Sequence, residues 1–187
     1  MELVVGISGA SGAIYGIRLL EALRRADVAS HLVVTRAAEK TIRLETDYAL
    51  EEVQALATHV YAIDDVGAAI ASGTFKMEGM VVVPCSIKSL SAIAHSYNEN
   101  LLTRAADVTL KERRRLVLVV RETPLHTGHL RAMLQVSETG GIILPPVPAF
   151  YHRPQTLDEV VNHTVGKVLD VFGVPHNLFE PWKGASE

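Results

Sequence analysis

Short runs of apolar residues alternate along the chain with longer segments that have helical periodicity. The apolar runs are nearly continuous, as is typical of parallel β-strands covered on both faces. The runs that predict strands are 3–8, 30–35, 80–85, 116–120 and 141–145. The segments that predict helices are 14–26, 86–96, 101–114, 125–138 and 156–173.

This repeated alternation predicts a doubly wound α/β fold, with a mostly parallel sheet and helices on both of its faces. A length of 187 residues fits a single domain, 1–187, with a partly extended tail from about residue 174. The last helix has the clearest limits, because Thr156 can cap its start, Glu159 follows three residues later, and Gly173 stands at its end. In such sheets, ligands bind beyond the carboxyl ends of the strands.

Composition and charge narrow the possible partners. Hydrophobic residues make up 48% of the chain and charged residues 21%, which is an ordinary globular composition. The net charge of −3 gives no reason to expect nucleic acid or an anionic membrane as a partner. The single cysteine, Cys85, fits a reducing compartment, and neither a signal peptide nor a membrane-spanning run is visible. We therefore expect a cytoplasmic protein.

A glycine-rich turn, "VVGISGASGAIYG" over residues 4–16, joins the first predicted strand to the first predicted helix. Its glycines match neither the G-x-G-x-x-G of dinucleotide sites nor a nucleotide P-loop. After the second strand stands Arg36, where an NAD site would need an acidic residue, and Thr35 beside it could bond a phosphate. The pattern favours a phosphate ester at a helix N-terminus, although a tight turn without a ligand stays open.

A second candidate loop, "PCSIKSLS" over residues 84–91, follows the strand 80–85. Ser86 can cap the next helix, and Lys88 and Ser89 add an amine and a hydroxyl near its N-terminus. Two such loops in neighbouring strand–helix units indicate a ligand that lies across a crevice.

With further segments, these two loops form an ordered set that resembles the UbiX-type flavin prenyltransferases. Those segments are "LETD" (44–47), "LLTRAADVTLKERR" (101–114), "RETPLH" (121–126), "PPVPAFYHRPQ" (145–155) and Trp182. The resemblance implies a flavodoxin-like fold and a metal-independent enzyme. Such an enzyme joins the dimethylallyl group of dimethylallyl phosphate to N5 and C6 of reduced FMN, and the prenylated FMN then serves a UbiD-type decarboxylase. It also implies a homo-oligomer, a dodecamer, with sites completed by neighbouring subunits.

The same resemblance assigns roles to individual residues. The positions that match FMN-binding residues are Ala10, Ser11, Gly12, Thr35, Ser86, Ile87, Lys88, Ser89 and Arg121. The positions that match the prenyl-phosphate site are Arg104, Lys111, Tyr151 and Lys167, the last of which is Arg in some members. Glu45 and Glu122 match carboxylates implicated in proton transfer, and Ser11 is expected to reach the reacting flavin.

Several alternatives stay open at this point. The chain could be an FMN-dependent decarboxylase of cysteine-containing peptides, or a flavin-binding accessory subunit without chemistry of its own. Either Glu122 or the released phosphate could take the proton of the flavin ring. Cys85 is expected to be a buried packing residue, Trp182 a packing or interface anchor, and the pair His126 and His129 lacks a third metal ligand in the sequence pattern.

Overall fold

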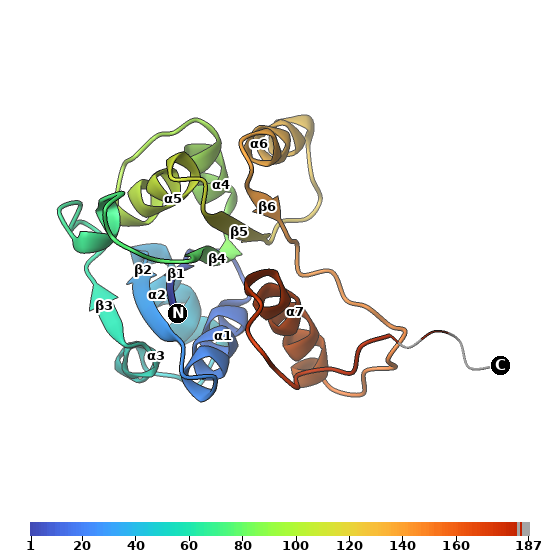
Figure 1. Cartoon of the computed structure of the whole chain (residues 1–187). Coiled ribbons are helices and arrows are strands. Elements are labelled where there is room, and N and C mark those ends of the chain that lie inside the picture. The colour runs from blue at the N-terminus through green and yellow to red at the C-terminus, as the bar shows by residue number, and fades with distance from the viewer. Residues whose placement is uncertain (183, 185–187) are drawn as a thin grey trace.

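A six-stranded parallel sheet forms the centre of the computed structural model, which describes residues 1–182 and 184 (Figure 1). Its strand order is β3-β2-β1-β4-β5-β6. The strands are β1 (Glu2–Ile7), β2 (Ala29–Val34), β3 (His59–Tyr61), β4 (Gly79–Cys85), β5 (Arg115–Val120) and β6 (Ile142–Ile143). The chain moves outward from β1 to β3, then returns to β4 on the other side of β1. The direction of winding therefore reverses between β1 and β4.

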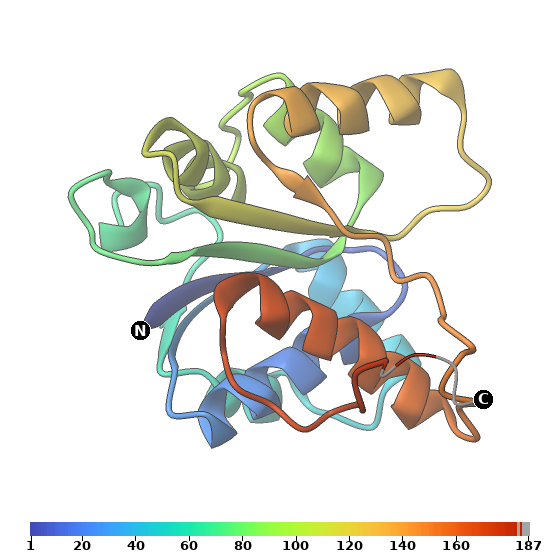
Figure 2. The same ribbon diagram turned by 45° about the vertical axis from the view of Figure 1, so that its right-hand side comes forward.

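Helices cover both faces of the sheet, which confirms the predicted doubly wound α/β class (Figure 2). One face carries α1 (Ala13–Arg25), α2 (Arg36–Glu45), α3 (Leu50–Leu56) and α7 (Leu157–Phe172). The other carries the 3-10 turn η1 (Ala69–Ala71), α4 (Ile87–Ala94), α5 (Leu101–Lys111) and α6 (Thr127–Glu138). Among the residues described, no helix has the length and apolar character needed to cross a bilayer.

The predicted helix caps are present. Thr156 accepts a hydrogen bond from the backbone N–H of Glu159 at 3.2 Å, and Gly173 ends α7 with a φ of 69°. Ser86 caps α4 in the same way, by accepting from the N–H of Ser89. These bonds satisfy N–H groups that have no partner within the helix.

Four elements have no counterpart in the prediction, namely β3, α2, α3 and η1, and one strand is shorter than expected. The edge strand β3 has three residues, of which His59 and Val60 are exposed, so no apolar run marks it. The helix α2 buries only Ala38 and Ile42 among its charged residues, and α3 buries only Val53. Such elements bury too few apolar residues to stand out in the sequence. In the run 141–145, only Ile142 and Ile143 pair with β5, because the prolines that follow cannot continue a ladder.

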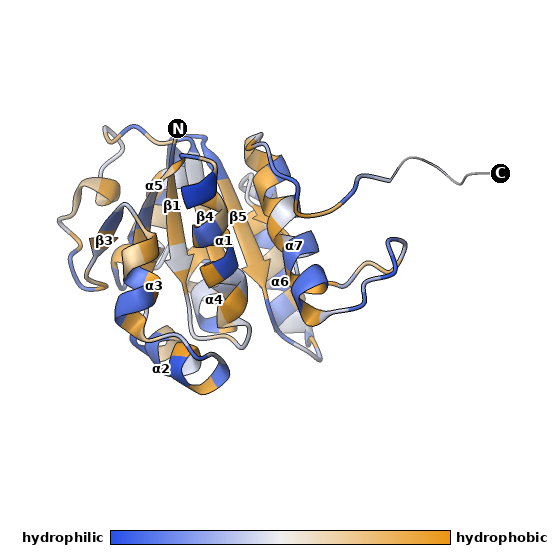
Figure 3. Cartoon of the chain, turned by 90° about the horizontal axis from the view of Figure 1, so that it is seen from below, coloured by the Kyte–Doolittle hydropathy of each residue, from blue (hydrophilic) through white to orange (hydrophobic). Residues whose placement is uncertain are grey.

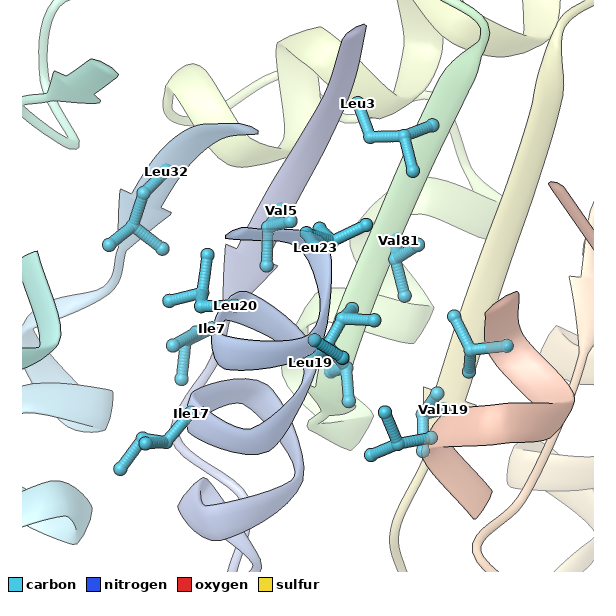
Figure 4. Close-up of a cluster of buried hydrophobic side chains, with 14 of the residues drawn as sticks. Leu3, Val5, Ile7, Ile17, Leu19, Leu20, Leu23, Leu32, Val81 and Val119 are labelled. Atoms are coloured by element: carbon cyan, nitrogen blue, oxygen red, sulfur yellow. The ribbon is translucent and has the colours of Figure 1, made fainter. Parts of the chain in front are cut away.

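Close packing of α1 on the sheet depends on Gly16. A Cβ at this position would lie 2.5 Å from the carbonyl oxygen of Val83 in β4, a contact that no side chain could tolerate. With Gly16 in place, Leu19, Leu20 and Leu23 of α1 are fully buried over the strands (Figure 4). The strands are predominantly hydrophobic where the helices cover them (Figure 3). This part of the glycine-rich turn therefore serves packing.

Ser8 ties the ends of the two central strands together. Its hydroxyl donates to the carbonyl of Pro84 at 2.8 Å and accepts from the N–H of Ser86 at 2.7 Å. Both bonds are buried or partly buried, and Ser8 itself has no exposed surface. The loop after β1 is thus held against the loop after β4.

A polar cluster surrounds the buried His31 of β2, next to the edge strand β3. His31 is 3% exposed, bonds to the Tyr61 hydroxyl at 3.0 Å, and lies 3.2 Å from the carboxylate of Glu2. Its ring stacks on His59 with a centroid separation of 4.7 Å. Burial lowers the pKa of His31, the bond to Glu2 opposes that shift, and the charge of His59 adds to it.

Replacing His31 by Gln is expected to make the free energy of unfolding less dependent on pH below neutrality. In the unfolded chain His31 takes up a proton at about pH 6.5, whereas in the folded protein its pKa is lower and protonation is disfavoured. The stability of the unchanged protein therefore falls as the pH drops through this range, and His31→Gln lacks that contribution. Urea unfolding at several pH values between neutral and mildly acid checks it. Parallel losses in the two proteins would contradict the expectation.

Candidate active site

A cleft of about 620 Å³ opens at the carboxyl ends of β1, β2 and β4, where the direction of winding reverses. It is lined by residues that follow each of these strands and by the start of α5. They include Gly9, Thr35, Arg36, Asp64, Ser86, Lys88, Ser89, Asn100 and Thr103. The cleft volume falls within the range of about 300–1,000 Å³ that is typical of small-molecule sites.

Three helix N-termini converge on this cleft. Thr35 caps α2 by accepting from the N–H of Ala38 at 3.2 Å, and Ser86 caps α4. Asn100 caps α5 by accepting from the N–H of Thr103 at 3.1 Å. Each cap satisfies one N–H and leaves others of the first turn free, while the positive ends of three helix dipoles meet at one place. The cleft is therefore suited to an anionic ligand, above all a phosphate.

Four of the predicted FMN-binding residues line this cleft, namely Thr35, Ser86, Lys88 and Ser89. The side chain of Lys88 reaches Glu99 at 3.1 Å, so its charge is already partly matched. Ile87 lies instead along a hollow between α4 and α6. Ser8 holds the loop after β1 against the loop after β4 at this cleft, although the bonded residues are 76 and 78 positions apart in the chain.

The sequence reasoning missed Asp64, Asn100 and Thr103, which also line the cleft. Asn100 had a usable signal, because an Asn directly before a predicted helix is a standard N-cap. Asp64 lies in the connection after the unpredicted strand β3, and nothing in the local pattern marks it.

The glycine-rich turn presents its N–H groups to a carboxylate of the chain itself. Gly12 begins α1 with a φ of 103°, a left-handed conformation that favours glycine. The N–H groups of Gly12 and Ala13 donate to the same oxygen of Glu45, at 2.7 and 3.2 Å. The anion position at the start of α1 is thus taken by Glu45, from the end of α2.

Ser11 stands next to this contact and is exposed, with no hydrogen bond to any residue that the structure describes. Ala10, by contrast, is buried at 8% exposure. The structure therefore brings Ser11 and Glu45, two of the three residues predicted to be catalytic, to one end of α1.

Arg121 and Glu122 follow β5 on the same edge of the sheet. The N–H of Arg121 donates to the carbonyl of Cys85 at 3.1 Å, and both side chains are exposed. Burial raises the pKa of the Tyr15 hydroxyl in α1, and the positive charge of Arg121 partly offsets that shift. Arg121 therefore lies within electrostatic reach of α1. The carboxylate of Glu122 accepts only from the N–H of Thr123, at 3.0 Å, among the described residues.

Two of the residues predicted to hold the prenyl phosphate lie on α5. Arg104 donates to the carbonyl of Ala71 at 3.2 Å and pairs with Asp107 at 3.2 Å. Lys111, at the other end of the helix, pairs with the neighbouring Glu112.

The other two lie on the opposite face of the sheet, on and beside α7. The Tyr151 hydroxyl lies 3.2 Å from Nε2 of His163, and Lys167 donates to Asp170 at 3.3 Å. Since α5 and α7 cover different faces (Figure 2), the structure does not unite the four residues within one chain.

The remaining candidates have packing or capping roles. Cys85 has no exposed surface, and burial raises the pKa of its thiol, which confirms it as a packing residue. The rings of His126 and His129 are tilted by 33° with centroids 3.6 Å apart, and His126 caps α6 by accepting from the N–H of Gly128. Trp182 is 62% exposed and lies edge-on to Tyr151 with a centroid separation of 5.6 Å.

Comparison with known proteins places the chain among flavin enzymes. Residues 1–169 match the model of the flavoprotein family. A flavin prenyltransferase UbiX of Thauera aromatica is 60% identical, with all of this chain and 96% of the relative aligned. The flavin prenyltransferase UbiX of Escherichia coli K12 is 62% identical, over 98% of this chain and 99% of the relative.

Solved structures agree with these relatives. A UbiX crystal structure in complex with FMN and dimethylallyl pyrophosphate superposes with a TM-score of 0.97 at 49% identity, covering 99% of this chain and 98% of the other. Peptidyl-cysteine decarboxylase EpiD reaches a TM-score of 0.61 at 13% identity over 79% of this chain and 82% of the other, a likeness of fold alone. The chain therefore belongs to the flavoprotein family and, within it, to the UbiX-type flavin prenyltransferases.

Proposed function

We propose that this flavin prenyltransferase moves the dimethylallyl group of dimethylallyl phosphate onto N5 and C6 of reduced FMN, without a metal ion, and supplies prenylated FMN to a UbiD-type decarboxylase. The observation that carries the proposal is the cleft where three helix N-termini meet, in a chain 49% identical to a structure solved with FMN and dimethylallyl pyrophosphate. The reduced flavin would supply the nucleophilic positions. The residues of the chain would bind, orient and move protons.

The phosphate of FMN is best assigned to the cleft between α2 and α4. Free N–H groups of both helices and the hydroxyls of Thr35, Ser86 and Ser89 would bind it there. The N–H groups of Gly12 and Ala13 are bonded to Glu45, so a phosphate at that turn would meet a carboxylate of like charge. This assignment leaves Ser11, Glu45 and Arg121 for the ring system of the flavin.

The leaving phosphate of the prenyl donor needs positive charge as its carbon–oxygen bond breaks. Arg104, Lys111, Lys167 and the Tyr151 hydroxyl would supply charge-assisted hydrogen bonds. Because these residues lie as two pairs on opposite faces of the sheet, we infer that different subunits contribute them to one site. A dodecameric UbiX-like protein of Escherichia coli O157:H7, 49% identical with a TM-score of 0.96 over 98% of this chain and all of the other, supports such an assembly.

Formation of the final carbon–carbon bond requires that a proton leave the flavin ring. Glu122 is exposed just after β5. Among the described residues, its carboxylate accepts a hydrogen bond only from the N–H of Thr123, so its other oxygen could accept that proton. The released phosphate is the other possible acceptor, and Glu45 would then orient groups at the start of α1.

Anaerobic incubation of the protein with reduced FMN and dimethylallyl phosphate is expected to yield a flavin heavier by one five-carbon unit, with one phosphate released per flavin. Mass spectrometry and a phosphate assay measure both quantities, and a mixture with oxidised FMN is the control. A protein that binds FMN but leaves the prenyl donor intact would instead be an accessory subunit. Consumption of a cysteine-containing peptide in place of the donor would indicate the decarboxylase.

Glu122→Gln is expected to bind FMN normally and to form product about 10²- to 10³-fold more slowly, the usual cost of removing a general base. Single-turnover measurements with mass detection follow the product. Glu138→Gln, at the exposed end of α6, is the matched control and is expected to react at the unchanged rate. A rate for Glu122→Gln within about twofold of the control would assign the proton to the released phosphate.

Ser86→Ala and Thr156→Ala form a matched pair, because each removes a hydroxyl that caps a helix by accepting a hydrogen bond from a backbone N–H three residues later. Both are expected to lower the free energy of unfolding by about 0.5–2 kcal/mol. Only Ser86→Ala is expected to weaken FMN binding, by about 3- to 30-fold, since only Ser86 lines the cleft. Titration followed by flavin fluorescence measures the affinity. Equal affinities in the two variants would rule out the cleft as the phosphate site.

A further inference from the structure

Tyr151 lies in a segment whose backbone cannot fix the position of its hydroxyl. Between β6 and α7, residues 144–156 form neither helix nor strand, and the Tyr151 side chain is 46% exposed. The hydroxyl therefore depends on side-chain contacts for its place. The contact that reaches the hydroxyl itself is the one to Nε2 of His163, at 3.2 Å.

His163 is well fixed. It is 8% exposed on α7, its ring stacks on His152 with centroids 5.0 Å apart and planes 11° apart, and the ring of Phe179 lies 4.7 Å away. Burial lowers the pKa of His163, and the nearby charges of His152 and Lys167 lower it further, against the opposing charge of Asp170. The ring is therefore a rigid and neutral hydrogen-bonding group near pH 7.

The segment after α7 holds this arrangement from the outside. Gly166 makes room for it, since a Cβ there would lie 2.5 Å from the ring of Phe179 and 2.8 Å from that of His176. The segment then reaches Trp182, whose ring lies edge-on to Tyr151. Packing of residues 174–182 on α7 thus supports both His163 and Tyr151.

Lys167 stands one helical turn beyond His163, on the same side of α7. Its charge contributes to the lowered pKa of His163, as expected for two side chains on the same side of the helix. The Tyr151 hydroxyl and the Lys167 ammonium group are therefore presented from one patch of α7, although they are 16 residues apart in the chain.

We propose that His163 is a positioning residue, which holds the Tyr151 hydroxyl beside Lys167 so that both bind the phosphate of the prenyl donor. The inference rests on the proposed function and extends it to a residue that does not touch substrate. The hydroxyl of Tyr151 has a single proton to donate. For Tyr151 to donate that proton to the phosphate, His163 must donate its Nε2–H to the phenol oxygen. The proposed role therefore requires the tautomer of His163 that carries its proton on Nε2.

The test combines four variants with the unchanged protein: His163→Phe, His163→Gln, Tyr151→Phe and the double variant Tyr151→Phe with His163→Phe. Phe keeps an aromatic ring in the pocket but cannot donate, whereas the Gln amide can. KM for dimethylallyl phosphate is measured at saturating reduced FMN. His163→Phe is expected to raise KM about 3- to 10-fold, the usual effect of losing one hydrogen bond, and His163→Gln to stay within about twofold of the unchanged protein.

The double variant carries the decisive comparison. If His163 acts through Tyr151, adding His163→Phe to Tyr151→Phe raises KM no further. FMN affinity is expected to be unchanged in all four variants, which also shows that they fold. Multiplicative effects of the two substitutions, or a His163→Gln variant as impaired as His163→Phe, would overturn the positioning role.

Failure of this inference can be told from failure of the proposed function. Absence of prenylated flavin from the unchanged protein overturns the function itself. If the unchanged protein turns over normally but the effects of the two substitutions on KM multiply, only the role of His163 is overturned. Calorimetric titration of dimethylallyl phosphate into protein loaded with oxidised FMN repeats the comparison for binding alone, and the same pattern of affinities is expected there.

Discussion

The parallel direction of all six strands is the constraint on which the rest of the structure depends. Each helix that follows a parallel strand starts at the same edge of the sheet, so N–H groups and positive dipole ends accumulate there. The reversal of winding between β1 and β4 separates the connecting segments and opens the cleft at that edge. At this edge Ser8 bonds the end of β1 to the loop after β4 and so fixes the two loops relative to each other.

This origin of positive potential explains how a chain of net charge −3 can present an anion site. Of the two cationic side chains at the cleft, Lys88 is paired with Glu99, whereas Arg36 forms no ion pair with the described residues. Backbone N–H groups cannot be neutralised in this way and keep their direction without cost in side-chain entropy. The same potential acts at the start of α1, where it holds the carboxylate of Glu45 next to Ser11. The N–H groups at helix N-termini therefore serve two parts of the candidate site. At α1 they bind the carboxylate of Glu45, and at the cleft they are free to bind an anionic ligand.

The strength of each local signal decided what could be predicted from the sequence. Long apolar strands and hydroxyl caps such as Ser86 and Thr156 reflect interactions within a few residues, and these predictions are confirmed. The short edge strand β3 and the highly charged α2 left no comparable pattern, so Asp64 went unnoticed. The bond between Glu45 and the start of α1 joins residues 33 positions apart, and no local pattern encodes that distance.

The four residues that we propose for the prenyl-phosphate site are divided between two faces of the sheet, and this division would make catalysis depend on assembly. A sheet covered by helices cannot let α5 and α7 meet, so under the proposed assignment Arg104 and Tyr151 would approach a common phosphate only across a boundary between chains. Residues of separate chains are not held together by a shared backbone. Ordering them when the chains associate would cost free energy, so each half of the site is best fixed within its own chain. On the α7 side, the support of Tyr151 by His163, and of His163 by Phe179, provides that rigidity within one subunit. The segment after α7 thereby acts on a site that it does not line.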